Sequence, residues 1–208
     1  NMIDDFKNNQ DIHAITASQV FNMPLDFVTG EMRSRAKAVN FGIVYGIGAY
    51  SLAKDIGVTN KEAKNYIESY LKHYSGIDKY MHDVVEKAKD TGYVETVFGR
   101  RRYLPELSAS NGMTRAFGER VARNAPIQGT AADIIKIAMI KVDKRLTKEN
   151  LEARLVLQVH DELIVECPSH ESMRVAMILQ EEMEKAVSLS VPLVADSAVG
   201  KTWYDAKG

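Results

Sequence analysis

This sequence lacks the features that would indicate a disulfide-stabilised or membrane-spanning protein. Cys167 is the only cysteine among 208 residues, so no disulfide framework can form and we expect a reducing compartment. No apolar run approaches the roughly 20 residues that a transmembrane helix needs, so we expect no membrane partner. The first residues, NMIDDFKNNQDIH, are acidic and rich in amides, unlike a signal peptide. Because position 1 is not methionine, we expect the chain to be a piece of something longer.

Charge is nearly balanced over the whole chain, at −1, but it is unevenly distributed along it. Cations predominate in residues 31–54 and 87–123, whereas acidic residues predominate in residues 161–208. Solvated surface is the ordinary interpretation of such charges. A locally basic segment can nevertheless bind phosphates whatever the total charge, so the balance does not exclude a polyanionic partner.

The first two thirds of the chain are predicted to be mainly helical. Apolar residues recur there every three or four positions, and a hairpin with a turn near Gly99 interrupts the pattern. Asp11 is expected to begin the first helix, and Thr59 or Asn60 to cap the third. Pro126 is expected to end a helix, because proline has no N–H to donate. The expected helices span residues 11–22, 30–46, 61–73, 77–90, 113–125 and 129–146.

The last third of the chain changes to the period of β-strands. Two β-rich runs, residues 153–159 and 162–167, are separated by almost nothing, and a helix over 171–187 and a strand over 192–200 are expected to follow. Strands packed by helices on one face predict an α+β fold with a small antiparallel sheet. We place a boundary near residue 108, between a helical domain, 1–108, and a second domain, 109–208.

The turn between the two strands carries an imidazole and two carboxylates, at His160, Asp161 and Glu162. Adjacent negative charges are unfavourable at a hairpin turn unless a cation offsets them, and oxygen ligands suit Mg²⁺. An exposed polar hairpin tip explains the same residues equally well. A metal-dependent phosphohydrolase with a His-Asp motif is a weaker alternative, because its chemistry needs more converging histidines than this chain offers.

The stretch RSRAKAVNFGIVYGIG places two cations and two aromatic rings on one helical face. Arg33, Lys37, Phe41 and Tyr45 are four residues apart, so they stay close together around a helix. The glycines in this run each cost a helix about 1 kcal/mol relative to alanine, which suggests that something approaches the backbone closely. An amphipathic helix with buried aromatics and solvated cations fits the same spacing.

Taken together, these motifs resemble DNA polymerase family A over essentially all 208 residues. The helix matches Arg-x3-Lys-x3-Phe-Gly-x2-Tyr-Gly, motif B of that family, and the carboxylate hairpin resembles motif C. The resemblance implies a helical fingers subdomain over 1–108 and part of a palm subdomain over 109–208. The stretches that carry it are DIHAITA, RSRAKAVNFGIVYG, GYVETVFGRRRYLPEL, RNAPIQGTAADIIKIAM, LQVHDELIVE and GKTWYDAK.

The resemblance implies a DNA-directed DNA polymerase, which adds deoxynucleotides to a primer 3′ end in DNA replication and repair. Its implied partners are primer-template DNA, deoxynucleoside triphosphates and the N-terminal part of the polymerase, and its implied location is the bacterial cytoplasm, associated with the nucleoid. Arg33 and Lys37 are implied to bind the triphosphate, with His13 near its phosphates. Phe41 is implied to contact the sugar and base, and Tyr45 to lie near the template base.

Catalysis in the family is implied to use two Mg²⁺ ions in the intact enzyme. Asp161 is implied to hold metal, Glu162 to assist it or the primer end, and Lys37 to help neutralise the leaving pyrophosphate. A further set is implied to contact DNA, by phosphates or by acceptors in the minor groove. That set is Arg100, Arg101, Arg102, Arg120, Asn124, Gln128 and His160.

One departure from the family pattern concerns motif A, which resembles DYSQIELR and supplies the second catalytic aspartate. The 208 residues contain Asp161 but no such stretch, and Asp4 and Asp5 lie in no comparable motif. We therefore expect the isolated chain to be inactive. Two alternatives remain: a catalytically dead module that binds DNA or nucleotide, and a subunit that receives motif A from another chain.

Overall fold

The computed structural model describes residues 2–8 and 10–207 and divides the chain into two compact units, Asn1–Gln128 and Gly129–Gly208. Each unit has its own hydrophobic core. The division falls within a helix, α7 (Gly112–Lys148), and not at the expected boundary near residue 108. Compact units and functional subdomains need not coincide, so the assignment of residues 1–108 to fingers stays a prediction. Among the described residues, no helix is long and apolar enough to cross a membrane.

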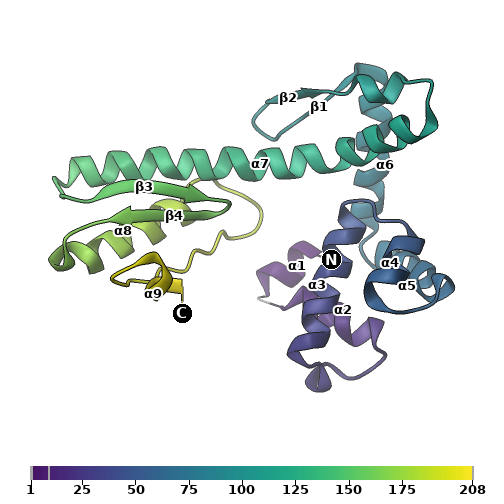
Figure 1. The fold of residues 1–208 in the computed structure, drawn as a ribbon, viewed down its shortest axis with the longest axis horizontal. Coiled ribbons are helices and arrows are strands. Elements are labelled where there is room, and N and C mark those ends of the chain that lie inside the picture. Colours follow the sequence, from purple (N-terminus) through teal and green to yellow (C-terminus); the bar gives the residue numbers. More distant parts are fainter. Residues whose placement is uncertain (1, 9, 208) are drawn as a thin grey trace. The chain divides into compact units, whose positions relative to one another are not determined.

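The first unit is helical, as the sequence predicts, with one short hairpin (Figure 1). Asp11 begins its helix by accepting hydrogen bonds from the N–H groups of His13 and Ala14, and Thr59 forms a reciprocal capping box with Glu62. The helices are α1 (Met2–Lys7), α2 (Ile12–Val20), α3 (Gly30–Val44), α4 (Ala49–Ile56), α5 (Asn60–His73) and α6 (Ser75–Thr91), with 3-10 turns η1 (Leu25–Phe27) and η2 (Pro105–Ser108). The sequence predictions omitted α1 and α4.

The expected hairpin is confirmed in the first unit. Strands β1 (Tyr93–Glu95) and β2 (Arg101–Tyr103) pair antiparallel, with Glu95 opposite Arg101. Gly99 has φ +79° in the connecting turn, a left-handed conformation that glycine adopts without steric cost. The turn therefore lies where the glycine predicted it.

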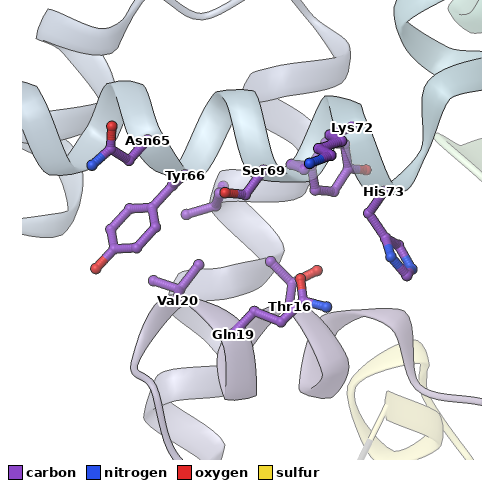
Figure 2. A pocket seen from close by; sticks show the side chains of 10 residues that line it. Thr16, Gln19, Val20, Asn65, Tyr66, Ser69, Lys72 and His73 are labelled. Carbon is purple, nitrogen blue, oxygen red and sulfur yellow. The ribbon is translucent and has the colours of Figure 1, made fainter.

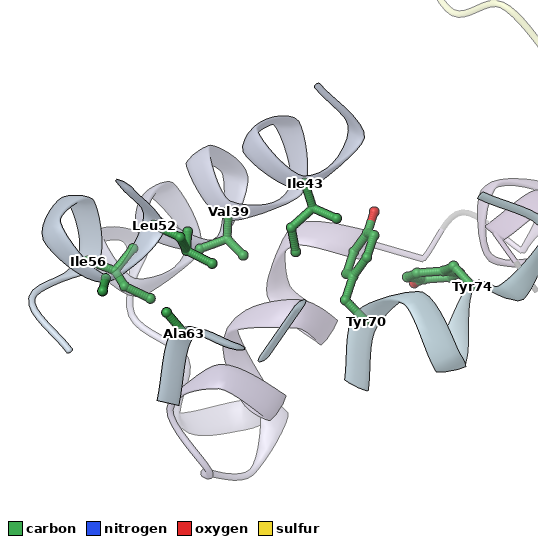
Figure 3. Packing of buried hydrophobic residues seen from close by; sticks show 8 residues of the cluster. Val39, Ile43, Leu52, Ile56, Ala63, Tyr70 and Tyr74 are labelled. Carbon is green, nitrogen blue, oxygen red and sulfur yellow. The ribbon is translucent and has the colours of Figure 1, made fainter. Parts of the chain in front are cut away.

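The core of the first unit determines how α3 is oriented. Val39 and Ile43 of α3 are 1% exposed and pack with Leu52 of α4 and with Ala63 and Tyr70 of α5 (Figure 3). Burying an aliphatic side chain of this size contributes about 1.5–3 kcal/mol. The apolar stripe of α3 thus faces the core, and residues half a turn away must face solvent.

The glycine after α3 ends that helix two residues earlier than predicted. Tyr45 caps α3, and Gly46 follows with φ +78°. A Cβ at Gly46 would lie 3.3 Å from a guanidinium nitrogen of Arg123 in α7. The close approach to the backbone that the glycines suggested is therefore present at Gly46, where the side chain of Arg123 occupies the space.

Helix α7 corrects the prediction that Pro126 separates two helices. The helix runs unbroken from Gly112 to Lys148 with Pro126 inside it. An interior proline costs about 3 kcal/mol or more, through a lost hydrogen bond and a clash with the preceding turn. Ala122 packs into a core cluster before the proline, and Val142 and Leu146 pack into another cluster after it. Burial on both sides of the proline outweighs this penalty. A pattern of neighbouring residues does not reveal that burial.

The second unit contains the expected antiparallel pair and a covering helix. Strand β3 (Arg154–Val159) pairs with β4 (Glu162–Glu166), and α8 (Ser172–Glu184) buries Val175 and Ile178 in the core of this unit. The 3-10 turn η3 (Ser169–Glu171) precedes α8, and α9 (Trp203–Lys207) lies near the end of the chain. The α+β class with a small antiparallel sheet is confirmed.

The strand predicted over residues 192–200 is wrong. The described chain is irregular there, and β3 and β4 pair only with each other. Val194 and Val199 are 77% and 53% exposed, so two of the segment's β-branched residues face solvent. A strand needs a neighbouring strand to exchange backbone hydrogen bonds with, and no described strand pairs with this segment.

We expect Gly46→Ala to destabilise the first unit by about 1–2 kcal/mol, because alanine is strained in the left-handed conformation. The contact with Arg123 adds to that cost. Gly76→Ala is the matched control: Gly76 lies within α6, a Cβ there meets nothing within 4 Å, and alanine favours helix by about 0.5–1 kcal/mol. Urea unfolding followed by circular dichroism measures both effects. Equal shifts for the two variants would contradict the role given to Gly46.

Candidate functional site

The exposed face of α3 holds the predicted row of cations and rings. Arg33 and Lys37 are exposed, Phe41 is 46% exposed and Tyr45 is half-buried. The ring centroids of Phe41 and Tyr45 lie 6.1 Å apart with 28° between their planes, and Lys37 Nζ lies 6.0 Å from the Phe41 centroid. The expectation that these residues share one face is confirmed. The alternative that Phe41 is a core residue is wrong, because the core takes the opposite face.

His13 of α2 lies beside this row. Its ring centroid is 5.9 Å from that of Phe41, and its Nδ1 is 2.9 Å from the side-chain nitrogen of Asn40. Burial lowers the pKa of His13 below its ordinary value, and the positive charges of Arg33 and Lys37 lower it further. Asp11 acts in the opposite direction but does not prevail. Burial and the two neighbouring cations therefore favour the neutral form of the His13 imidazole.

The two cations of the row differ in their partners. Arg33 Nε donates to Asp11 Oδ2 at 2.5 Å, whereas Lys37 forms no ion pair within the described chain. Burial raises the pKa of Asp11, but hydrogen bonds from Arg33 and from the α2 backbone outweigh it, and the net pKa is lowered. Arg33 is thus held beside the start of α2, and Lys37 is free of a competing carboxylate.

We call these five residues the nucleotide face, after the ligand that the family resemblance implies for them: Arg33, Lys37, Phe41, Tyr45 and His13. It is an exposed surface with two cations, a neutral imidazole and two stacked rings. Such a set suits a ligand with several negative charges and a flat ring, since the cations attract phosphate and the rings offer stacking surface.

The predicted residues of α7, Arg120, Asn124 and Gln128, flank Arg123, which lies beside Gly46 after α3. Arg120 lies with its guanidinium 5.8 Å from the Phe117 ring centroid. Asn124 has a buried side-chain oxygen without a hydrogen-bond partner among the described residues, and Gln128 is exposed. A buried oxygen without a partner is costly, so Asn124 is the least satisfied of these polar groups.

The basic hairpin is already partly paired. Arg101 Nε donates to Glu95 at 2.7 Å, and its guanidinium carbon lies 4.4 Å from the Tyr93 ring centroid. Arg100 and Arg102 are exposed on the same hairpin. The charge of Arg101 is therefore offset by a carboxylate, and the expected contacts of the three arginines with DNA stay a prediction.

A cavity of about 660 Å³ lies between α2 and α5, away from the nucleotide face (Figure 2). None of the sequence-predicted site residues lines it. Tyr70 contributes to its wall, and burial raises the pKa of the Tyr70 hydroxyl to about 12. The remaining lining residues are Thr16, Gln19, Val20, Val39, Asn65, Tyr66, Ser69, Lys72 and His73.

In the second unit, the carboxylate turn joins β3 to β4. His160 has φ +52°, and its carbonyl accepts a hydrogen bond from Gln158 Nε2 at 2.5 Å. Asp161 is exposed, and Glu162 Oε2 lies 3.3 Å from Lys207 Nζ. Lys207 of α9 therefore offsets one of the two adjacent carboxylates, that of Glu162.

The described residues do not complete a metal site. Within residues 2–8 and 10–207, no group of three histidine, cysteine or acidic side chains lies close enough to hold a metal ion. Asp161 offers one exposed carboxylate, and Glu162 is engaged with Lys207. The described chain therefore fits one position of a metal's ligand shell and not a whole shell.

Two residues of the candidate site escaped the sequence predictions. The side-chain nitrogen of Asn40 lies 2.9 Å from His13 Nδ1, and Arg123 lies beside Gly46, the residue after Tyr45. The sequence carries a signal for Asn40, because it is an amide at an apolar position of the helix. Arg123 carries none, because an arginine one turn from other charged residues looks like helix surface.

The chain belongs to DNA polymerase family A. Residues 1–205 match that family. The chain is 51% identical over 207 residues to DNA polymerase I of Bacillus caldotenax and 52% identical to that of Geobacillus stearothermophilus, covering 100% of this chain and 24% of each relative. The chain therefore spans about a quarter of the length of these relatives.

A solved structure supports the same assignment. The POL domain of Pol1 from M. smegmatis, in complex with DNA primer-template and dNTP, matches 99% of this chain with a TM-score of 0.94 and 44% sequence identity. This chain covers 36% of that one. The family and the fold are thus shown by independent comparisons.

Proposed function

We propose that these residues are the nucleotide-binding and DNA-binding part of a DNA-directed DNA polymerase that acts in replication and repair. The observation that carries the proposal is the exposed row of Arg33, Lys37, Phe41 and Tyr45 beside His13. Family membership supports it, as does the M. smegmatis relative, whose structure contains DNA primer-template and dNTP. On this proposal residues 1–108 belong to the fingers and residues 109–208 to the palm, in a bacterial cytoplasmic enzyme associated with the nucleoid.

Each member of the nucleotide face has a distinct role in the proposal. Arg33 and Lys37 bind the triphosphate and neutralise the leaving pyrophosphate, and His13 donates a hydrogen bond to a phosphate oxygen. Phe41 lies against the sugar and base, and Tyr45 lies near the template base. Lys37 is available at once, whereas Arg33 must leave Asp11 to reach the phosphates.

The proposed DNA contacts lie in both units. Arg100, Arg101 and Arg102 are proposed to bind template phosphates, and Arg101 does so after giving up Glu95. On α7, the side chains of Arg120, Asn124 and Gln128 donate to minor-groove acceptors, which differ little between base pairs. His160 is proposed to contact the primer. These contacts hold DNA of any sequence.

Asp161 is the residue proposed to bind Mg²⁺, with Glu162 assisting it or the primer end. When bound, Mg²⁺ supplies positive charge that stabilises the oxygens around the transferred phosphoryl group. The described residues provide one exposed carboxylate for it, so the remaining ligands must come from a motif A aspartate, from substrate and from water. The proposal therefore assigns Asp161 a role only within the larger enzyme.

A second candidate function follows from the same carboxylate. Residues 1–208 contain Asp161 without a motif A partner, so this stretch by itself suits a module that binds nucleotide or DNA without chemistry. A subunit that receives motif A from another chain is the remaining possibility. Primer extension separates these cases.

We expect residues 1–208 alone to show no primer extension with Mg²⁺ above a no-protein control. A longer polypeptide that carries the family's motif A ahead of these residues is expected to extend the primer, and Asp161→Asn in it to abolish extension. Templated synthesis by the purified 208 residues would overturn the requirement for a second carboxylate. Failure of the longer polypeptide, when folded, would contradict the polymerase proposal.

Lys37→Gln is expected to weaken binding of a deoxynucleoside triphosphate by about 10- to 100-fold. A hydrogen bond to a charged group contributes about 1.5–3 kcal/mol, and 1.4 kcal/mol is tenfold in affinity. Arg35→Gln is the matched control, because Arg35 lies on another face of α3 and pairs with Glu31 at 2.8 Å. Fluorescence titration at fixed salt measures both dissociation constants. Equal weakening by the two variants would mean that affinity depends on net charge alone.

Asp11→Asn is expected to tighten triphosphate binding by about 1.5- to 5-fold. The exposed Arg33–Asp11 ion pair is worth about 0.2–1 kcal/mol, and its loss frees Arg33, while asparagine still caps α2. Glu31→Gln makes the same change of charge at Arg35 and is expected to leave the affinity unchanged. A higher dissociation constant for Asp11→Asn would show that the ion pair holds Arg33 ready for the ligand.

A further inference from the structure

Asn40 is an unusual residue for its position. It is 4% exposed on the apolar stripe of α3, between Val39 and Ile43, where an uncompensated amide is destabilising. Its side-chain nitrogen lies 2.9 Å from His13 Nδ1 and 3.4 Å from the Ile12 carbonyl oxygen, while its oxygen has no hydrogen-bond partner among the described residues. An apolar residue would avoid the unsatisfied oxygen. We therefore attribute the presence of the amide to the contacts of its nitrogen with His13 and Ile12.

The neighbours of Asn40 determine which ring nitrogen of His13 carries the proton. A backbone carbonyl only accepts, so the amide atom facing Ile12 must be the nitrogen donor. The same NH₂ group faces His13 Nδ1, which must then accept. A neutral imidazole that accepts at Nδ1 has its proton at Nε2.

The charges around His13 favour the same neutral state. Arg33 and Lys37 oppose a further positive charge, Asp11 favours it, and Asp11 is itself paired with Arg33. A hydrogen bond that is accepted at Nδ1 also stabilises the neutral form, because the protonated ring has no lone pair there. The backbone carbonyl of Ile12 in α2 and the side chain of Asn40 therefore favour the same tautomer of His13, with the proton on Nε2.

We propose that Asn40 is a positioning residue, which holds His13 as a neutral imidazole with Nε2–H as its only donor toward the triphosphate. The last step rests on the proposed function of the nucleotide face. A neutral donor binds a phosphate oxygen without adding a charge that varies with pH. Asn40 itself touches neither phosphate nor base, and it acts through the ring of His13.

Nitrogen NMR of residues 1–208 labelled at histidine tests the tautomer directly. The signals of His13 are those that disappear in His13→Gln, which separates them from His73, His82, His160 and His170. In the unchanged protein we expect an Nδ1 shift typical of an unprotonated, hydrogen-bonded nitrogen and an Nε2 shift typical of N–H. A protonated Nδ1 in neutral His13 would overturn the proposal without the need for any variant at Asn40.

Two substitutions of Asn40 distinguish positioning from packing. Asn40→Asp keeps the shape but replaces the donor by an acceptor, so it is expected to move the proton to Nδ1 and to raise the pKa of His13 by about 1 or more. Asn40→Leu keeps similar bulk without a donor, and is expected to raise the pKa of His13 by less. If both variants fold, with unchanged circular dichroism, but leave the tautomer and pKa of His13 unaltered, Asn40 is only a packing residue.

Titration with a deoxynucleoside triphosphate separates this inference from the proposed function. We expect the Nε2 signal of His13 to shift on binding while Nδ1 keeps its acceptor shift, and Lys37→Gln to require about 10- to 100-fold more ligand for the same change. An Nδ1 acceptor with no response of Nε2 to triphosphate would support the positioning by Asn40 and overturn the triphosphate role. A response of Nε2 to triphosphate together with a protonated Nδ1 would support the triphosphate role and overturn the positioning by Asn40.

Discussion

The burial of one stripe of α3 is the constraint on which the candidate site depends. Ala36, Val39 and Ile43 face the core, so the rotation of the helix about its axis is set by apolar packing worth several kcal/mol. With that rotation, Arg33 and Phe41 have to face solvent, whatever their own preferences. The functional face therefore consists of the residues that the core excludes, and the packing that stabilises the unit also orients the site.

Electrostatics then gives the site its polarity. Two cations lie one helical turn apart, and a third positive charge beside them, on His13, is opposed by burial, by both cations and by Asn40. Asp11 offsets one cation while capping α2, so a single carboxylate serves helix formation and charge compensation. In the second unit, Lys207 offsets the charge of Glu162, as Asp11 offsets that of Arg33. In both units a charged group proposed to take part in binding or catalysis is offset by a partner that a ligand can replace.

Much of the local structure and of the candidate site could be predicted from patterns along the chain. Helix starts at Asp11 and Thr59, the hairpin at Gly99 and the carboxylate turn all depend on interactions between residues a few positions apart. The spacing of Arg33, Lys37, Phe41 and Tyr45 is likewise a property of α3 alone. Such features follow from backbone geometry and short-range hydrogen bonds, which the order of residues specifies.

The sequence by itself therefore determined most of the helices, the caps at Asp11 and Thr59, the two hairpins and the spacing of the residues along α3. Only the tertiary structure decided that α7 passes through Pro126, that residues 192–200 form no strand and that Gly46 makes room for Arg123. It also joined Asn40 to His13, 27 residues apart along the chain. Each of these outcomes depends on burial or contact between distant segments, and the free energy of such contacts does not appear in any local pattern.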